Sequence, residues 1–201
     1  MTKNEFQLIE KYVDRNNPKV ELNYAYVDFD NKCICATDTK MVIKVHLTDE
    51  EITNCKGVFF VHKKLLRTII SMCAKDTDYV FEDNFIKLEN NKIYLDTANS
   101  DRYKFPDLTN VFSKVYDESF VYDDLFFIDF ELTHKNTHIS SHTFKPLQEF
   151  SEAAKYEISY QPQTAKSVGM AKIDGYKDNQ LRYEVIHMGI EYKPLEPTLF
   201  D

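Results

Sequence analysis

The order of the predicted elements in the first half of the chain restricts the fold more than any other feature of the sequence. The hydrophobic pattern predicts an amphipathic helix over residues 3–15, followed by three strand-like runs. After a short apolar run at residues 58–61, it predicts a second helix over residues 62–75, again followed by three strand-like runs. Residues 1–105 therefore repeat one unit, a helix followed by an antiparallel three-stranded meander.

The second half of the chain shows the same pattern once. Residues 106–118 lack a clear period and are predicted to be a linker. A β-rich run at 120–133 and a candidate strand at 137–140 precede a predicted helix over residues 143–155 and three further strands at 156–160, 168–174 and 181–190. We therefore expect an α+β protein with two small domains. Their bounds are 1–106 for the first domain, 107–119 for the linker, 120–191 for a shortened second domain and 192–201 for an extended tail.

The second predicted helix carries a concentration of positive charge. It contains Lys63, Lys64, Arg67 and Lys75 and no acid, whereas the whole protein has a net charge of −8, so the rest of the chain carries −8 − 4 = −12. At about 100° per residue, the apolar and the basic residues fall on opposite arcs of the helix. One arc can pack on a core while the other offers cations to an anionic partner. An ordinary solvated helix face is the alternative interpretation.

Composition excludes several classes of site. The chain has only four glycines, none in a GxGxxG or GxxxxGK pattern, which excludes the common glycine-rich phosphate-binding loops. No apolar run is long enough to span a bilayer and no signal-peptide pattern opens the sequence, so we expect a soluble, cytoplasmic protein. The four cysteines form no CxxC pair. Cys33 and Cys35 share one face of a strand, and we expect buried thiols rather than disulfides or a zinc site.

Several segments resemble DNA polymerase sliding clamps. The segments CICATDTKMVIKV (33–45) and VFFVHKKLLRTII (58–70) are similar to the early strands and the following helix of a clamp. FPDL (105–108) resembles the junction after a domain of the bacterial β clamp. MAKIDG (170–175) and LRYEVIHMGIE (181–191) resemble the last hairpin of both bacterial and PCNA-like clamps.

The resemblance implies a fold in which helices line a central hole and sheets form the outside. Such a ring holds duplex DNA topologically, and its inner cations neutralise phosphates without reading bases. It implies no catalytic activity, no cofactor and no metal, and it implies a DNA polymerase and a clamp loader as partners. Two domains per chain imply a homotrimer, with a monomer or a weak dimer as the alternative, at a replication site in the cytoplasm, the nucleoid or a viral compartment.

The resemblance also assigns candidate residues to two sites. The DNA-facing candidates on the three predicted helices are Lys11, Arg15, Lys63, Lys64, Arg67, Lys145 and Lys155. A partner-peptide groove at the domain junction is assigned to Met41, Val111, Phe112, Met188 and Ile190. Packing of the two domains against each other is the alternative role for this second group.

Other constellations point to different functions. His134, His138 and His142 recur every fourth residue, as metal ligands on a helix do, although the residues between them are poor helix formers. Asp28 and Asp30 stand two apart, as carboxylates of a metal-dependent nuclease can, but Asp30-Asn31 is equally a turn signal. An acidic, aromatic-rich stretch at 117–131 indicates either an exposed sheet face or a surface that mimics DNA.

The C-terminal segment EPTLFD (196–201) supports an alternative function. Its Leu199-Phe200 pair resembles the QLxLF-type peptides with which other proteins bind clamps. On this hypothesis the chain is a non-catalytic accessory protein or inhibitor that docks on a replication clamp. A frayed tail with incidental apolar residues is the simpler interpretation.

Overall fold

The computed structural model describes residues 1–14, 16–75, 77–88, 91–95, 104–113, 116, 118–123, 141–161 and 169–190. Within these ranges, the side chains of residues 118, 141–144, 169 and 188–190 are not described. Arg15, the candidate strand at 137–140 and the tail at 192–201 lie outside the described residues, so the expectations about them stay predictions.

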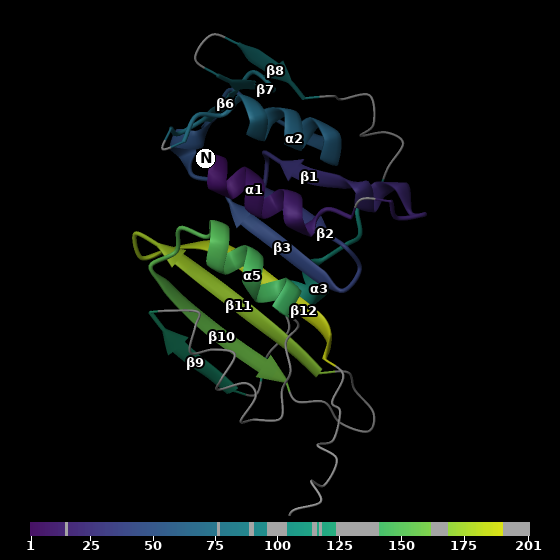
Figure 1. The fold of residues 1–201 in the computed structure, drawn as a ribbon, viewed down its shortest axis with the longest axis vertical. Coiled ribbons are helices and arrows are strands. Elements are labelled where there is room, and N and C mark those ends of the chain that lie inside the picture. Colours follow the sequence, from purple (N-terminus) through teal and green to yellow (C-terminus); the bar gives the residue numbers. More distant parts are fainter. Residues whose placement is uncertain are drawn as a thin grey trace, which may run out of the picture.

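An eight-stranded antiparallel sheet runs through both halves of the chain (Figure 1). Its strand order is β5-β1-β2-β3-β12-β11-β10-β9. Because β3 pairs with β12, the sheet passes from the first half of the chain to the second without a break. The strands are β1 (Tyr24–Asp28), β2 (Cys33–Thr37), β3 (Met41–His46), β5 (Val58–His62), β9 (Glu118–Tyr122), β10 (Lys155–Gln161), β11 (Gly169–Lys177) and β12 (Gln180–Ile190).

A second sheet contains four short strands in the order β4-β6-β7-β8. The strands are β4 (Ile52–Thr53), β6 (Val80–Glu82), β7 (Phe85–Lys87) and β8 (Lys92–Tyr94). The β4–β6 pair is parallel and the other two pairs are antiparallel. Just before β6, Tyr79 and Met1 exchange two main-chain hydrogen bonds of 2.8 and 2.6 Å.

Three helices of ten residues form a layer against the sheets. They are α1 (Lys3–Tyr12), α2 (Lys63–Met72) and α5 (Ser141–Phe150). Helix α1 lies between α2 and α5 and contacts both (Figure 1). The remaining helical elements are short: η1 (Val20–Asn23), η2 (Asp49–Glu51) and α3 (Thr109–Phe112).

The core fills the space between the helix layer and the sheets. Phe6 of α1 and Leu66 and Ile69 of α2 are at most 3% exposed and join the same apolar cluster as Phe81 of β6. The Phe6 and Phe81 rings meet edge to face with their centroids 6.4 Å apart. On α5, Leu147 is 1% exposed in this cluster, so one continuous core supports all three helices.

Within the described residues, the predicted order of the main helices and strands is confirmed, but several boundaries differ. The first helix ends at Tyr12 rather than at residue 15, because Val13 is already extended. The last helix covers residues 141–150 rather than 143–155, because Lys155 already pairs with Tyr176 in the β10–β11 ladder. The predicted linker contains the short helix α3, in which the amide of Phe112 donates to the carbonyl of Leu108 at 3.0 Å.

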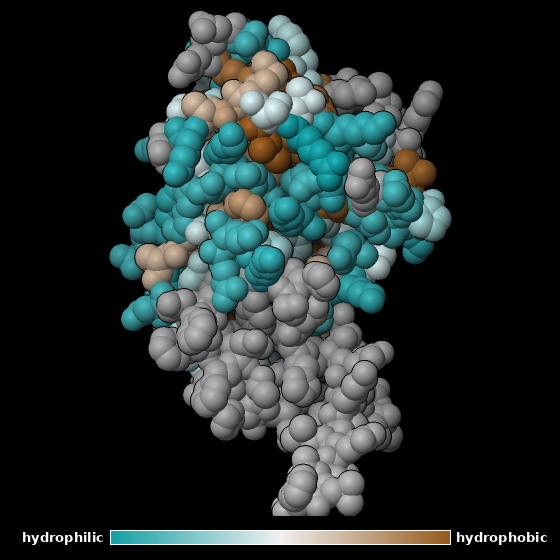
Figure 2. All heavy atoms as spheres, viewed as in Figure 1, coloured by the Kyte–Doolittle hydropathy of each residue, from teal (hydrophilic) through white to brown (hydrophobic). Residues whose placement is uncertain are grey.

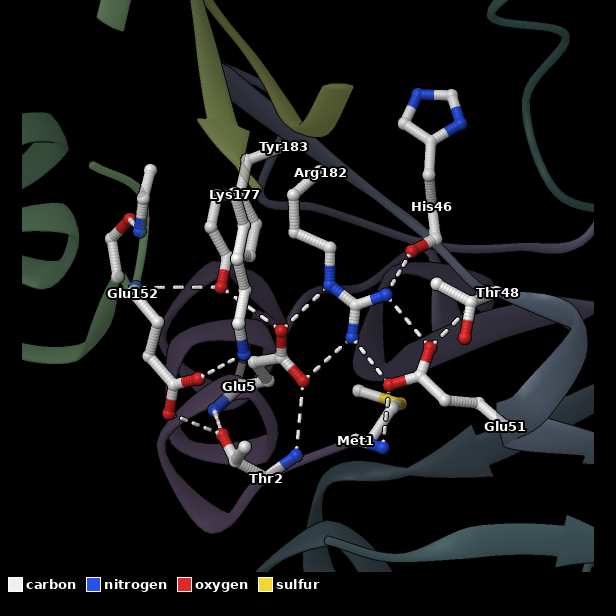
Figure 3. Close-up of polar contacts among 12 residues, drawn as sticks. Met1, Thr2, Glu5, His46, Thr48, Glu51, Glu152, Lys177, Arg182 and Tyr183 are labelled. Atoms are coloured by element: carbon white, nitrogen blue, oxygen red, sulfur yellow. Dashed lines mark hydrogen bonds and ion pairs between the residues drawn. The ribbon is translucent and has the colours of Figure 1, made fainter. Parts of the chain in front are cut away.

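A buried ion network joins segments that are far apart in the sequence (Figure 3). The Arg182 guanidinium on β12 donates two 2.7 Å hydrogen bonds to the carboxylate of Glu5 on α1. It donates two more of 2.7 Å to the carboxylate of Glu51 at η2, and one to the carbonyl of His46. The Tyr183 hydroxyl donates to Glu5 at 3.0 Å. These contacts fix α1 and η2 to β12, and therefore fix the first half of the chain to the second.

Both carboxylates also organise the backbone beside them. Glu5 accepts a hydrogen bond from the amide of Thr2 at 2.9 Å, which completes a capping box at the start of α1. Glu51 forms the same kind of capping box with Thr48 at η2. It also forms an ion pair with the amino group of Met1 at 2.5 Å. Burial alone would raise the pKa of Glu51, but the hydrogen bonds and charge of Arg182 outweigh burial and lower it to about 2.

Arg182→Ala is expected to lower the free energy of unfolding by about 3–5 kcal/mol, because it leaves two buried carboxylates without their main partner. Urea denaturation followed by circular dichroism measures the loss. Lys87→Ala is the matched control: the Lys87 side chain is 62% exposed and pairs with Glu82 at the surface. That variant is expected to lose no more than about 0.5 kcal/mol. Equal losses in the two variants would contradict the role of Arg182.

The stability of the protein is expected to fall in acid between pH 4.5 and about 2. The pKa of Glu51 and that of Glu184 lie at about 2, against an ordinary value of 4.5. Their contribution is complete above pH 4.5 and is lost as the pH falls through the folded-state value, because the unfolded chain binds protons first. Urea midpoints measured across this range test the expectation. The Arg182→Ala variant is expected to show a smaller acid-dependent loss, and an unchanged slope would count against it.

Candidate nucleic-acid interface

Four of the seven predicted DNA-binding residues, Lys11, Lys64, Arg67 and Lys145, are exposed on the three helices of the helix layer. Figure 2 shows the outward side of this layer in the orientation of Figure 1, and hydrophilic residues cover most of the described surface over α1 and α2. The exposed basic residues on the helices, or within three residues of a helix end, are Lys11, Lys64, Arg67, Lys75 and Lys145. Lys75 follows the end of α2 and was not among the predicted site residues.

Lys63 does not belong to the exposed group. Its ammonium donates to the carbonyl of Val13, the residue that ends α1, and only 13% of its side chain is exposed. Lys3, the first residue of α1, donates in turn to the carbonyl of Cys73, which ends α2, at 3.0 Å. The two antiparallel helices therefore cap each other with the lysine that begins each of them. Burial lowers the pKa of Lys63, and its cation serves the helix pair rather than the surface.

Glu10 sets the position of Arg67 in this layer. Its carboxylate accepts a hydrogen bond from Nε of Arg67 at 2.8 Å and lies 3.6 Å from the Lys63 ammonium. The Glu10 side chain is 9% exposed and that of Arg67 is 50% exposed. The guanidinium is therefore anchored at its inner edge and reaches solvent at its outer edge. Sequence reasoning missed Glu10, since nothing in the local pattern marks a carboxylate of α1 as buried.

The third helix carries only one of the two lysines predicted on it. Lys145 is exposed on α5, on the same helix as the exposed Glu149. The placement of Lys155 on this helix was wrong: Lys155 begins β10, where its ammonium lies 5.9 Å from the centre of the Tyr176 ring. Lys11 of α1 reaches toward α5, with its ammonium 5.6 Å from the centre of the Phe150 ring.

The predicted peptide groove is divided between the two faces of the sheet. Alternation along β3 places Met41 on the side of Ile43 and Val45, which face the core under the helices, and Met41 is 8% exposed. Phe112 lies on the opposite side, where the Lys44 ammonium is 5.2 Å from its ring centre. A groove on the outer face therefore excludes Met41. Val111 and Phe112 are half-buried in α3, which contacts β12, while the side chains of Met188 and Ile190 lie outside the described residues.

The competing constellations have structural roles where they are described. Asp28 accepts two hydrogen bonds of 2.9 Å from Asn31, and Asp30 accepts one of 3.2 Å from the amide of Gly57. Both carboxylates therefore stabilise turns. Across the described ranges, no three His, Cys, Asp or Glu side chains are grouped so as to hold a metal ion. His134 and His138 lie outside those ranges, as does most of the acidic stretch at 117–131, and so these predictions stay open.

Among the described residues, no helix is both long enough and apolar enough to cross a bilayer.

Comparison with solved structures identifies the fold. A putative DNA polymerase III beta subunit from Eubacterium rectale matches 96% of this chain over 64% of its own length, with a TM-score of 0.58 and 12% identity. The DNA polymerase III subunit beta of Pseudomonas aeruginosa matches 95% of this chain over 65% of its length, with a TM-score of 0.61 and 8% identity. The subunit beta of Borrelia burgdorferi, solved in complex with a natural product, gives a TM-score of 0.58 at 12% identity.

These similarities establish a sliding-clamp fold, as the resemblance in the sequence predicted. The chain spans about 64% of the length of the first two clamp subunits it matches. No protein-family model matches the sequence, and no curated protein matches it. The likeness is therefore one of architecture, carried by helix-plus-meander units with very little residue identity.

Proposed function

We propose that this protein is a non-catalytic DNA polymerase processivity factor that encircles duplex DNA with the layer formed by α1, α2 and α5 facing the phosphates. The observation that supports this most directly is the distribution of charge on a clamp fold. Exposed cations gather on the helix layer of a protein whose net charge is −8. Duplex DNA is the anionic partner that suits such a face, and a ring needs only weak contacts with it, because topology prevents escape.

The chemistry of the layer suits contact with phosphates rather than with bases. Lys64 is exposed and offers a compact ammonium charge, whereas Arg67 presents a guanidinium that Glu10 holds at one edge. Each such cation neutralises a phosphate and releases a counterion, so affinity depends on salt and not on sequence. Contacts of this kind let a ring move along the duplex while a polymerase is tethered to it.

Ring closure requires strand edges that can pair between chains. Among the described strands, β9 ends the eight-stranded sheet and β8 ends the four-stranded sheet. Each edge exposes a large apolar side chain: Val121 on β9 is 54% exposed and Tyr94 on β8 is 69% exposed. Open main-chain groups beside apolar side chains favour pairing with another strand. We propose that three chains close a ring through such edges, and that a polymerase and a clamp loader bind the ring.

Lys64→Glu is expected to weaken binding to a duplex of about 30 base pairs roughly tenfold at low salt, because it replaces a phosphate contact with a repulsive charge. It is also expected to lower the slope of log affinity against log salt by about one. Fluorescence anisotropy at several salt concentrations measures both quantities.

Two controls accompany this measurement. Lys87→Glu makes the same charge change on β7, away from the helix layer, and is expected to change affinity less than about twofold. Lys63→Gln removes the cap on α1 and is expected to lower stability while leaving the salt slope unchanged. If Lys64→Glu and Lys87→Glu behave alike, the helix layer is not the DNA-binding face.

The mass in solution is expected to be near three times 23.7 kDa at tens of micromolar, as a ring of three chains requires. Light scattering coupled to size-exclusion chromatography measures it. Val121→Lys on the β9 edge is expected to shift the mass to that of the monomer, because it places a charge in the proposed strand pairing. A wild-type protein that stays monomeric and does not load on circular DNA would instead favour the accessory-protein hypothesis.

A further inference from the structure

Cys33 and Cys35 form a pair on the outer face of the eight-stranded sheet. Ile34 and Ala36, their neighbours along β2, join the core under the helices, whereas the two cysteines do not. Strand alternation therefore turns both thiols to the opposite face. They are 5% and 6% exposed, and neither is in a disulfide.

Residues 104–113, called the strap here, cross the sheet above this pair. Cys35 stands in register between Tyr26 on β1 and Lys44 on β3. The Tyr26 ring stacks on Phe105 with centroids 4.9 Å apart, and the Lys44 ammonium lies 5.2 Å from the centre of the Phe112 ring. Both cross-strand neighbours of Cys35 therefore hold the strap.

The surroundings of the pair are polar. Cys33 stands in register between Asp28 and His46, and Cys35 lies beside Lys44. A hydrogen bond from Cys35 and the charge of Lys44 lower the pKa of Cys33 and outweigh its burial, which raises it. In contrast, burial raises the pKa of Cys73, which packs in the apolar core together with Cys55. The chain thus contains one polar thiol pair and two single thiols in apolar surroundings.

We propose that Cys33 and Cys35 form a redox-sensitive dithiol, which a hydroperoxide converts to an intrachain disulfide that loosens the strap. The Cys33 thiolate attacks one oxygen of hydrogen peroxide, the O–O bond breaks, and hydroxide leaves with Cys33 oxidised to a sulfenic acid. The Cys35 thiol then attacks the sulfenic sulfur and water leaves. Two thiols and one peroxide give one disulfide and two waters.

The geometry of β2 explains why a disulfide between Cys33 and Cys35 would loosen the strap. Residues two apart in a strand have Cα atoms roughly 6.5–6.8 Å apart. A disulfide prefers a Cα separation of about 5.5–6 Å, so closing the bond shortens β2. The shortening disturbs the register of Cys35 with Tyr26 and Lys44, and these are the residues that carry the aromatic contacts of the strap.

The test treats the full chain with hydrogen peroxide, alkylates the remaining thiols after denaturation and maps the peptides by mass spectrometry. The expected product is a peptide containing residues 33–35 that is not alkylated and is lighter by two hydrogen atoms. It is expected to form at least about tenfold faster than any oxidation of Cys55 or Cys73. Hydrogen exchange in residues 104–113 is expected to increase in the oxidised protein and to recover after a dithiol reductant is added.

Two variants locate the chemistry. Cys35→Ser is expected to accumulate a sulfenic acid at Cys33 that dimedone traps, whereas Cys33→Ser is expected to give neither the trapped adduct nor the disulfide. Equal oxidation of all four cysteines would overturn the proposal, as would a disulfide that leaves exchange in the strap unchanged. Neither readout depends on DNA binding, so failure here is distinguishable from failure of the proposed function.

Discussion

The burial of one arginine between two carboxylates is the constraint on which the arrangement of this protein depends. A charge removed from water is tolerated only when it is paired and fully hydrogen-bonded. Arg182 meets this condition only if Glu5 on α1 and Glu51 at η2 both reach β12, which they do at 2.7 Å. Helix α1, η2 and β12, which contribute residues 5, 51 and 182, must therefore assemble together. Because Glu5 also caps α1, the network positions the helix that stands at the centre of the helix layer.

Within that layer, the cations are divided between structure and surface. Lys3 and Lys63 each donate to the carbonyl at the C-terminal end of the other helix, while Lys64 and Arg67 face solvent. Glu10 neutralises part of the positive charge of α2 and also orients the Arg67 guanidinium. The result is a face with a few well-placed cations and not a densely basic surface. Such a face suits the ring around DNA that we propose, since strong attachment to phosphates would slow its movement.

The two faces of the eight-stranded sheet have different chemistry. The inner face is apolar and continuous beneath all three helices. On the outer face, Lys172 pairs with both Asp174 and Glu184 at 2.9 Å, and the strap crosses the sheet near Lys44. The outer face thus holds polar networks, a thiol pair and a covering segment, while the inner face supports the helices. The two faces of this antiparallel sheet therefore differ in polarity.

The sequence by itself determined the class of the fold, because hydrophobic periodicity and turn residues act locally. The order of helices and strands and the amphipathic arcs of α2 follow from such patterns. Only the tertiary structure decided which charges are available. Lys63 and Lys64 are adjacent and chemically identical, yet one caps α1 and the other meets solvent, because their side chains leave the helix at different angles toward different neighbours. The predictions for Lys155 and Met41 failed for a similar reason. Pairing of β10 with β11 places Lys155 in a strand and not in the preceding helix, and the pairing of β3 turns the side chain of Met41 toward the core. Those outcomes depend on contacts between distant segments, and the periodicity of a single segment does not predict such contacts.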